Sequence, residues 1–126
     1  MAVVLDASAL LALIWQEPGA DAVSEALDKA VMSAVNWAEV VSKLQDRGID
    51  IDAAVPMLSD LPIDVIPFDR ELAVAAGALR VRSRHLGLSI GDRACLALAA
   101  RLSLPAYTAD KSWSKFDAGV EVKLVR

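Results

Sequence analysis

Short, mostly apolar runs alternate along this chain with longer segments of helical periodicity, and that alternation limits the folds open to it. The strand-like runs lie at residues 3–5, 31–33, 63–68 and 105–108. A strand that reads as a continuous apolar run is typical of a parallel sheet, because the crossover helices of such a sheet cover both of its faces. We therefore expect an α/β three-layer sandwich, with a central, mostly parallel sheet of about five strands flanked by helices.

The segments between these runs have the length and apolar spacing of helices. We expect helices at residues 7–17, 20–30, 35–47, 51–61, 69–84 and 90–102. The last of these is apolar on nearly every side and should lie in the middle of the fold. Near the end of the chain, Val120, Val122 and Leu124 alternate with charged residues, which is typical of a half-exposed edge strand. No repeat or linker interrupts the sequence, so we expect one domain over residues 1–126.

Charge and histidine content exclude several classes of function. The net charge of −4 gives no overall attraction for nucleic acid, so a phosphate-bearing substrate needs a local basic patch or a bound cation. The candidate patch is Arg80, Arg82, Arg84 and His85, a pattern equally typical of a solvated helix end. His85 is the only histidine, which excludes a two-histidine ribonuclease mechanism and leaves the serines without a base for a catalytic triad.

The cysteine and hydropathy patterns indicate where such a protein would work. Cys95 is the only cysteine and lies in the apolar run ACLALAA, as a small core residue in a reducing compartment would. No run reaches the roughly 18 apolar residues that suggest a membrane span, and the apolar start lacks the basic residues of a secretory signal. We expect a cytoplasmic protein with no membrane segment.

Four acidic residues from distant parts of the chain are expected at one edge of the sheet. Asp6 directly follows the first strand, Glu39 lies about one turn into the helix after the second, and Asp110 follows the fourth. Asp92 lies in the first turn of its helix, which must begin near the same edge because the parallel strand after it starts at the opposite one. Ligand sites in open parallel sheets form beyond the carboxyl ends of the strands.

Each of these acids also has a local structural explanation. Asp6 and Asp110 stand where N-cap residues of helices stand, Ser89 and Asp92 have the spacing of a capping box, and Glu39 and Lys43 form an i,i+4 pair. These four explanations are independent of one another, whereas a shared site uses all four acids at once.

Electrostatics favours a cation if the acids do meet. Two carboxylates about 5 Å apart repel by roughly 3 kcal/mol at an effective dielectric of 20, so three or four could not stay ionised without a positive charge between them. Ligands that are all oxygen select hard ions, so the sequence predicts Mg²⁺ or Mn²⁺ and not zinc.

At these residues the chain resembles the PIN-domain ribonucleases, and among them the VapC-type toxins of type II toxin–antitoxin pairs. The matching segments follow one another in the family's order: VVLDASALLAL, MSAVNWAEVVSKL, LSIGDRACLALA, LPAYTADKSW and the closing VEVKLVR. The resemblance spans nearly the whole chain. It implies a PIN fold and a metal-dependent endoribonuclease, in which metal-activated water attacks an RNA phosphodiester in line and leaves 5′-phosphate and 3′-hydroxyl ends.

The resemblance also implies the roles of individual residues. By position, the catalytic acids are Asp6, Glu39, Asp92 and Asp110. Of these, Asp6 and Asp92 are the expected metal ligands, and the other two would complete the shell of a Mg²⁺ or Mn²⁺ ion directly or through water. Ser8 and Thr108 would orient the carboxylates. Asp117 is a further acid nearby that we expect to lie outside the site.

The partners implied by the resemblance are an RNA substrate, a cognate antitoxin and a second copy of the chain. The RNA would be structured, with transfer RNA as one possibility. The antitoxin would fill the acidic groove, commonly with an arginine, and Trp15 on the first two helices is a candidate contact for it, although tryptophans more often belong to the core. Toxins of this family usually form homodimers, which we also expect here.

Two other interpretations remain open at the level of sequence. An aspartate-based phosphoryl-transfer protein would need a second aspartate two positions after Asp6, where Ser8 stands, or the acidic pair of a receiver domain, which is missing. A PIN-like module could also bind RNA or protein without cutting it, although the presence of all four acids favours the enzyme.

Overall fold

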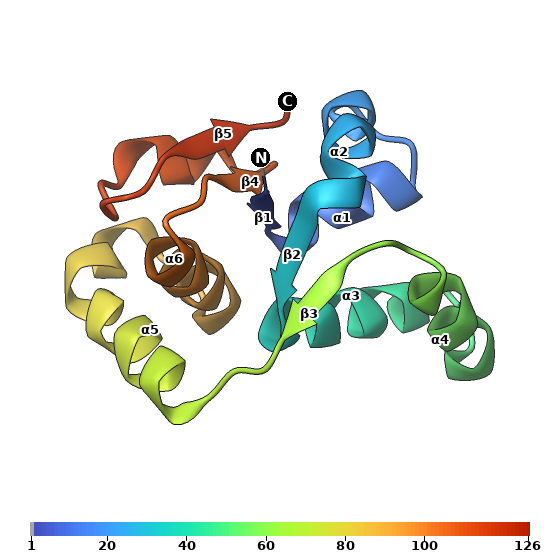
Figure 1. The fold of residues 1–126 in the computed structure, drawn as a ribbon, viewed down its shortest axis with the longest axis horizontal. Coiled ribbons are helices and arrows are strands. Elements are labelled where there is room, and N and C mark those ends of the chain that lie inside the picture. Colours follow the sequence, from blue (N-terminus) through green and yellow to red (C-terminus); the bar gives the residue numbers. More distant parts are fainter. Residues whose placement is uncertain (1) are drawn as a thin grey trace.

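The computed structural model describes residues 2–126 and contains one sheet of five parallel strands (Figure 1). The strands are β1 (Val3–Leu5), β2 (Ala30–Ser33), β3 (Asp64–Ile66), β4 (Ala106–Thr108) and β5 (Val122–Leu124). Their order across the sheet is β3-β2-β1-β4-β5, and all four neighbouring pairs are parallel. The chain therefore crosses from one half of the sheet to the other after β3, and β1 and β4 lie side by side at its centre.

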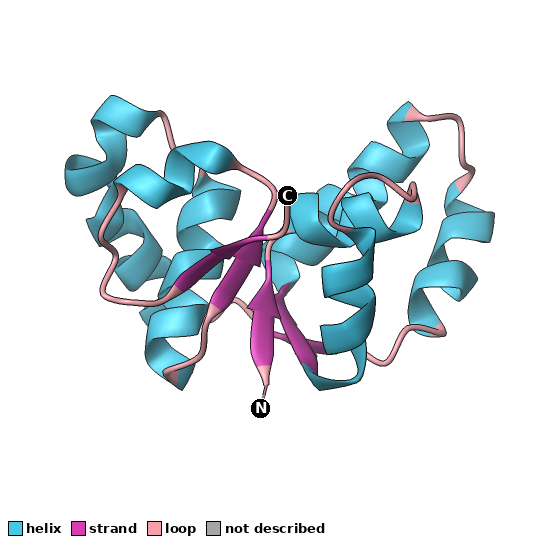
Figure 2. Ribbon diagram, turned by 90° about the horizontal axis from the view of Figure 1, so that it is seen from above, coloured by secondary structure: helices cyan, strands magenta, loops and turns pink. Residues whose placement is uncertain are grey.

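Helices cover both faces of this sheet, which gives the three layers expected (Figure 2). The α-helices are α1 (Ala7–Ile14), α2 (Ala20–Ala26), α3 (Ala34–Asp46), α4 (Ile51–Ser59), α5 (Arg70–Ser83) and α6 (Ile90–Leu102). Short 3-10 helices follow α2, follow α5 and precede β5, at Leu27–Lys29, Arg84–Leu86 and Lys111–Lys115. The predicted α/β sandwich is confirmed, with a sheet that is parallel throughout.

Alternation along β1 divides the hydrophobic core into two parts. Val3 and Leu5 point into a core with α1, α2, α3 and α4, while Val4 between them points to the opposite face and packs with α5 and α6. Because a strand directs successive side chains to opposite faces, a strand buried on both sides must be apolar throughout. Helix α6 is buried along residues 94–99, as its uniformly apolar sequence predicts.

The structure corrects the expected boundaries of three segments. Helix α1 ends at Ile14 and not at residue 17, because Gln16 adopts a left-handed backbone (φ 54°) and Glu17 precedes Pro18, which disfavours the helical conformation. Helix α2 stops at Ala26 and continues as a 3-10 turn. Strand β3 covers only Asp64–Ile66, which is shorter than the expected run at residues 63–68.

Helix α4 keeps Pro56 inside it. Strand β5 is the half-exposed edge strand that its alternation predicts.

Cys95 is fully buried in the core against α5, and burial raises the pKa of its thiol well above the usual value. Within residues 2–126, none of the helices combines the length and the apolar character needed to cross a membrane.

Candidate active site

All four sequence-predicted acids line one pocket at the carboxyl end of the central strands. The pocket has a volume of about 260 Å³, and its acidic residues include Asp6, Glu39, Asp92 and Asp110. They come from the ends of β1 and β4, from the second turn of α3 and from the first turn of α6, so parallel topology delivers them to one edge. Ala7, Ser8, Leu11, Trp15, Glu17, Lys43 and Arg126 complete the lining.

Asp6 stands at the N-cap position of α1, yet its side chain makes no capping hydrogen bond. Its Oδ2 atom instead accepts hydrogen bonds from the hydroxyls of Ser8, at 2.7 Å, and Thr108, at 2.9 Å. The residue is only 3 % exposed. The local explanation of Asp6 as a helix cap is therefore wrong, and the side chain is oriented by residues of two different elements.

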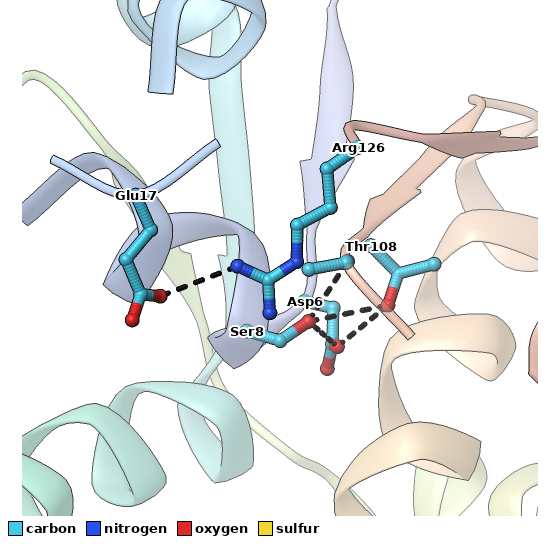
Figure 3. Close-up of polar contacts among 6 residues, drawn as sticks. Asp6, Ser8, Glu17, Thr108 and Arg126 are labelled. Carbon is cyan, nitrogen blue, oxygen red and sulfur yellow. Dashed lines mark hydrogen bonds and ion pairs between the residues drawn. The ribbon is translucent and has the colours of Figure 1, made fainter. Parts of the chain in front are cut away.

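The two hydroxyls belong to a network that joins α1 to the end of β4 (Figure 3). The backbone N–H of Ala109 donates to Ser8 Oγ at 3.0 Å, and the N–H of Asp110 donates to Thr108 Oγ1 at 3.0 Å. The two hydroxyl oxygens lie 3.2 Å apart. Because each hydroxyl accepts from the backbone and donates to Asp6, the carboxylate has a defined orientation beside the segment that carries Asp110.

Glu39 is held against α6 by a fully buried asparagine. Asn36 Nδ2 donates to Glu39 Oε1 at 3.1 Å and to the carbonyl oxygen of Gly91 at 3.0 Å, so it links α3 to the start of α6. Gly91 leaves space for the carboxylate, since a Cβ atom built there would overlap Glu39 Oε1. The close ion pairs among residues 2–126 do not include one between Glu39 and Lys43, so the i,i+4 pair acts only at longer range, where the charge of Lys43 slightly opposes the rise in the pKa of Glu39.

Asp92 and Asp110 do perform the local roles that the sequence suggested. Ser89 and Asp92 form a reciprocal capping box at the start of α6, with hydrogen bonds of 2.8 and 3.1 Å. Asp110 Oδ1 accepts from the backbone N–H of Ser112 at 2.9 Å and caps the following 3-10 helix. Both residues also line the pocket, so capping fixes these carboxyl groups at the site.

Burial, with repulsion between neighbouring carboxylates as a smaller cause, raises the pKa values of three of the acids. Burial raises the pKa of Asp6 from 3.8 to about 6; the hydrogen bonds from Ser8 and Thr108 oppose this rise, and the charges of Asp92 and Glu39 add to it. Burial likewise raises the pKa of Glu39 and that of Asp92, with smaller contributions from neighbouring carboxylates. The carboxylates are therefore close enough to repel one another electrostatically, as members of a single acidic site do.

The donor set of this pocket fits a hard divalent cation. Every acidic ligand candidate offers oxygen, and burial together with neighbouring carboxylates disfavours the ionised form of three of them, which a bound cation would offset. Among residues 2–126, no three acidic, histidine or cysteine side chains stand close enough to share one ion. A cation held by one or two carboxylates and several waters, the usual arrangement for Mg²⁺, matches that spacing.

Sequence analysis did not identify several residues that line the pocket or support its acids. Asn36 had a detectable signal, since it lies four and eight residues before Val40 and Leu44 on the buried stripe of α3, where a polar residue needs a partner. Gly91 is the residue directly before Asp92, but nothing local reveals the close approach of Glu39. Glu17 and Arg126 are brought in by the tertiary fold alone.

Other residues considered from the sequence lie outside the pocket or have structural roles. The basic cluster Arg80, Arg82, Arg84 and His85 is exposed at the end of α5 and the following turn. Asp117 is exposed and accepts from the N–H of Gly119, and it is not part of the pocket lining, as expected.

The three tryptophans differ in environment. Trp15 is partly buried at the pocket, with the Arg47 guanidinium 3.8 Å above its ring. Trp37 packs partly buried on the core of α1 to α4, and Trp113 is fully buried on the opposite face. The usual role of tryptophan in a core therefore holds for Trp113 and in part for the others.

Comparison with known proteins agrees with this fold. The family model for the PIN domain matches residues 3–119, so the chain belongs to the PIN domain family. Searched against curated proteins, the sequence gives no match.

Solved structures of toxin–antitoxin systems share the architecture over their full length. A toxin–antitoxin complex from Klebsiella pneumoniae has a TM-score of 0.76 at 20 % identity, covering 99 % of this chain and 98 % of that one. FitAcB from Neisseria gonorrhoeae has a TM-score of 0.75 at 20 % identity, covering 98 % and 97 %. The sarcin–ricin loop cleaving toxin VapC20 from Mycobacterium tuberculosis has a TM-score of 0.72 at 20 % identity, covering 93 % and 98 %. At this identity the likeness establishes the fold.

Proposed function

We propose that this protein is a metal-dependent endoribonuclease and the toxin component of a toxin–antitoxin pair. The observation that carries the proposal is the convergence of Asp6, Glu39, Asp92 and Asp110 on one pocket of a PIN domain. Structural likeness to VapC20, a toxin that cleaves the sarcin–ricin loop, supports RNA as the substrate class.

The residues of the pocket have distinct parts in this proposal. Asp6 and Asp92 would hold a Mg²⁺ or Mn²⁺ ion, and Glu39 and Asp110 would complete its surroundings through water, since no three acids within residues 2–126 stand close enough to share one ion. When bound, such an ion lowers the pKa of a coordinated water and neutralises charge on the transferring phosphoryl group. Ser8 and Thr108 keep Asp6 oriented by donating to the same carboxylate oxygen.

Asn36 and Gly91 have a related part on the other side of the pocket. Asn36 fixes the Glu39 carboxylate by a hydrogen bond, and Gly91 leaves room for it beside α6. The raised pKa of Asp6, at about 6, means that part of the population holds a proton near neutral pH in the absence of a cation. A cation therefore has to compete with that proton, which makes its binding pH-dependent.

The biological setting is proposed from the structural neighbours. The similar structure from Klebsiella pneumoniae is a toxin–antitoxin complex, which supports a cognate antitoxin as partner of this chain. We place the protein in the cytoplasm, as a homodimer, acting on a structured RNA such as transfer RNA. Trp15 at the rim of the pocket is a candidate contact for the antitoxin. Sedimentation of the purified chain, alone and with its antitoxin, tests the dimer and the complex.

Cleavage of cellular RNA tests the enzymatic proposal. Purified protein with Mg²⁺ or Mn²⁺ should cut RNA into fragments with 5′-phosphate and 3′-hydroxyl ends, and EDTA should stop the reaction. Asp92→Asn should abolish cutting while circular dichroism shows a folded protein. Asp117→Asn is the matched control, since it removes a carboxylate that does not line the pocket and should cut normally.

Each outcome of this experiment separates the enzyme from a binding module. A wild-type protein that binds RNA and never cuts it, with either ion, would favour the non-catalytic PIN-like module. Normal cutting by Asp92→Asn would show that the assigned site is wrong. Cutting that persists in EDTA and leaves 2′,3′-cyclic phosphate ends would exclude the proposed hydrolytic route.

A further inference from the structure

The pocket contains basic residues that the acidic site does not explain. Five carboxylates line it, and two cations, Lys43 and Arg126, lie among them. The net negative charge of this lining repels a polyanion such as RNA. A basic side chain inside the pocket therefore has a large influence on whether a backbone phosphate can enter.

The backbone beside Arg126 is fixed in place on two sides. The N–H of Val125 donates to the carbonyl oxygen of Thr108 at 2.9 Å, and Val125 is buried. On the other side Gly19, with a left-handed φ of 102°, lies so close that a Cβ atom built there would be 2.7 Å from the Val125 carbonyl oxygen. The Thr108 hydroxyl also donates to Asp6, so Thr108 positions both the Asp6 carboxylate and Val125, the residue before Arg126.

The guanidinium of Arg126 extends over the rim of the pocket between Glu17 and Asp6 (Figure 3). Within residues 2–126 its ion pair is with Glu17, with Nη1 3.3 Å from Oε1, and not with any of the four site acids. Both side chains are 37 % exposed, and pairs of this kind contribute little to stability. A guanidinium has five N–H donors, so a single contact leaves most of them for another ligand.

We propose that Arg126 binds a backbone phosphate of the RNA next to the bond that is cut, and that Glu17 keeps the guanidinium at the rim until the RNA arrives. The inference rests on the proposed nuclease function. A planar guanidinium matches the geometry of a phosphate and can contact it through two parallel hydrogen bonds. Arg126 touches the substrate beside the site, while the carboxylates act on the scissile group.

RNA binding measured without cleavage tests this role. In an Asp92→Asn background, fluorescence anisotropy of a labelled, randomised single-stranded RNA gives the dissociation constant over a series of salt concentrations. Arg126→Gln should weaken binding about tenfold at low salt, as expected for a hydrogen bond to a charged group. It should also reduce the slope of log K against log salt by about 0.7, the value for one lost phosphate contact.

Two further variants make the result specific. Arg126→Lys keeps the charge and loses the planar fork, so it should retain the salt slope and recover only part of the affinity. Arg101→Gln is the matched control, because Arg101 forms a similarly exposed ion pair, with Asp69, at the opposite end of α6 from Asp92. It should leave both the affinity and the slope unchanged.

The outcomes distinguish this inference from the proposed function. If no form of the protein binds RNA, the proposed nuclease function and the phosphate-binding role of Arg126 are both overturned. If the background protein binds RNA, and Arg126→Gln binds with the same affinity and slope as Arg101→Gln, only the phosphate role is overturned. If Arg126→Gln in the otherwise wild-type protein increases the rate of cutting, Arg126 blocks the pocket and does not serve the substrate.

Discussion

Two aspartates of this protein occupy the same local position and have opposite environments. Asp6 and Asp69 each stand at the N-cap of a helix, α1 and α5 respectively. Asp69 is exposed, accepts from the N–H of Leu72 at 2.9 Å and pairs with Arg101. These contacts, the backbone hydrogen bond foremost, hold the pKa of Asp69 below its usual value. Asp6 is buried, makes no capping bond, and has a pKa raised to about 6.

The ionised form of Asp69 therefore stabilises the folded protein, whereas the ionised form of Asp6 destabilises it. Every contact of Asp69 favours its ionised form, as a structural carboxylate requires. Around Asp6, burial and two neighbouring carboxylates disfavour that form, and only the hydroxyls of Ser8 and Thr108 favour it. A residue type and a position along a helix therefore do not reveal function, whereas the balance of charge around the side chain does.

Neutralising Asp6 gives the largest effect that this contrast predicts. Asp6→Asn should lower the rate of RNA cleavage by more than about 100-fold, because groups that only orient a metal ligand already contribute 10–100-fold. The amide oxygen can still accept from Ser8 and Thr108, so the free energy of unfolding at pH 7 should be equal to that of the wild type or higher. Cleavage assays and urea unfolding check the two parts. An Asn variant that cuts at the wild-type rate would remove Asp6 from the site.

Two glycines on helices can be compared in the same way, one beside the acidic site and one away from it. Gly91→Ala places a Cβ where the Glu39 carboxylate lies, so Glu39 must move and cleavage should fall on the order of 10–100-fold. Gly77→Ala on α5 meets no atom within 4 Å and should leave cleavage unchanged while stabilising the helix by about 0.5–1 kcal/mol. Equal cleavage by the two variants would show that the position of Glu39 does not matter.

The sequence predicted the fold well because parallel topology follows from local patterns. Apolar strand runs and helical spacing specify alternating elements, and the right-handed crossover connection then leaves few arrangements. The same topology brought Asp6, Glu39, Asp92 and Asp110 to one edge without any knowledge of distances. Helix ends were less well predicted, since the early end of α1 depends on the left-handed conformation of Gln16.

Long-range contacts of the site could not be predicted from local patterns. Asn36 meets Gly91 across 55 residues, and Thr108 meets Asp6 across 102. Arg126 reaches Glu17 across 109 residues. No helix period or capping rule specifies such a pair, because each depends on how two elements pack. The local explanations also failed to separate Asp6 from Asp110, since only the structure shows which of them caps a helix.

The stability of the metal-free protein should respond to pH in a direction set by Asp6. Its pKa of 3.8 rises to about 6 in the folded state, so between about pH 4 and pH 6 the folded chain holds a proton that the unfolded chain has lost. Stability is then fully present below about pH 4 and falls as the pH rises through 6, by roughly 3 kcal/mol at most. Glu39 and Asp92 act in the same direction.

Urea unfolding in EDTA at several pH values measures this loss. Asp6→Asn should lack most of it, and Mg²⁺ should reverse it in the wild type, because an ion that binds only the folded protein stabilises it. If the stability of the wild-type protein rises from pH 4 to pH 6 as much as that of Asp6→Asn, the pKa of Asp6 is not raised in the folded state.

Asp69 gives the smallest effect and the opposite sign. Because its pKa is lowered in the folded state, its contribution is present above its unfolded pKa and lost as the pH falls. Asp69→Asn keeps a capping side chain and loses the ion pair with Arg101, so the urea midpoint should fall slightly, and added salt should shrink the difference. Asp69→Ala also loses the bond from Leu72 and should fall further. RNA cleavage should stay at the wild-type rate in both variants. A loss of cleavage that exceeds the loss of folded protein would mean that the acidic site extends to α5. Asp69 would then be a functional acid like Asp6, and the distinction between the two aspartates would not hold.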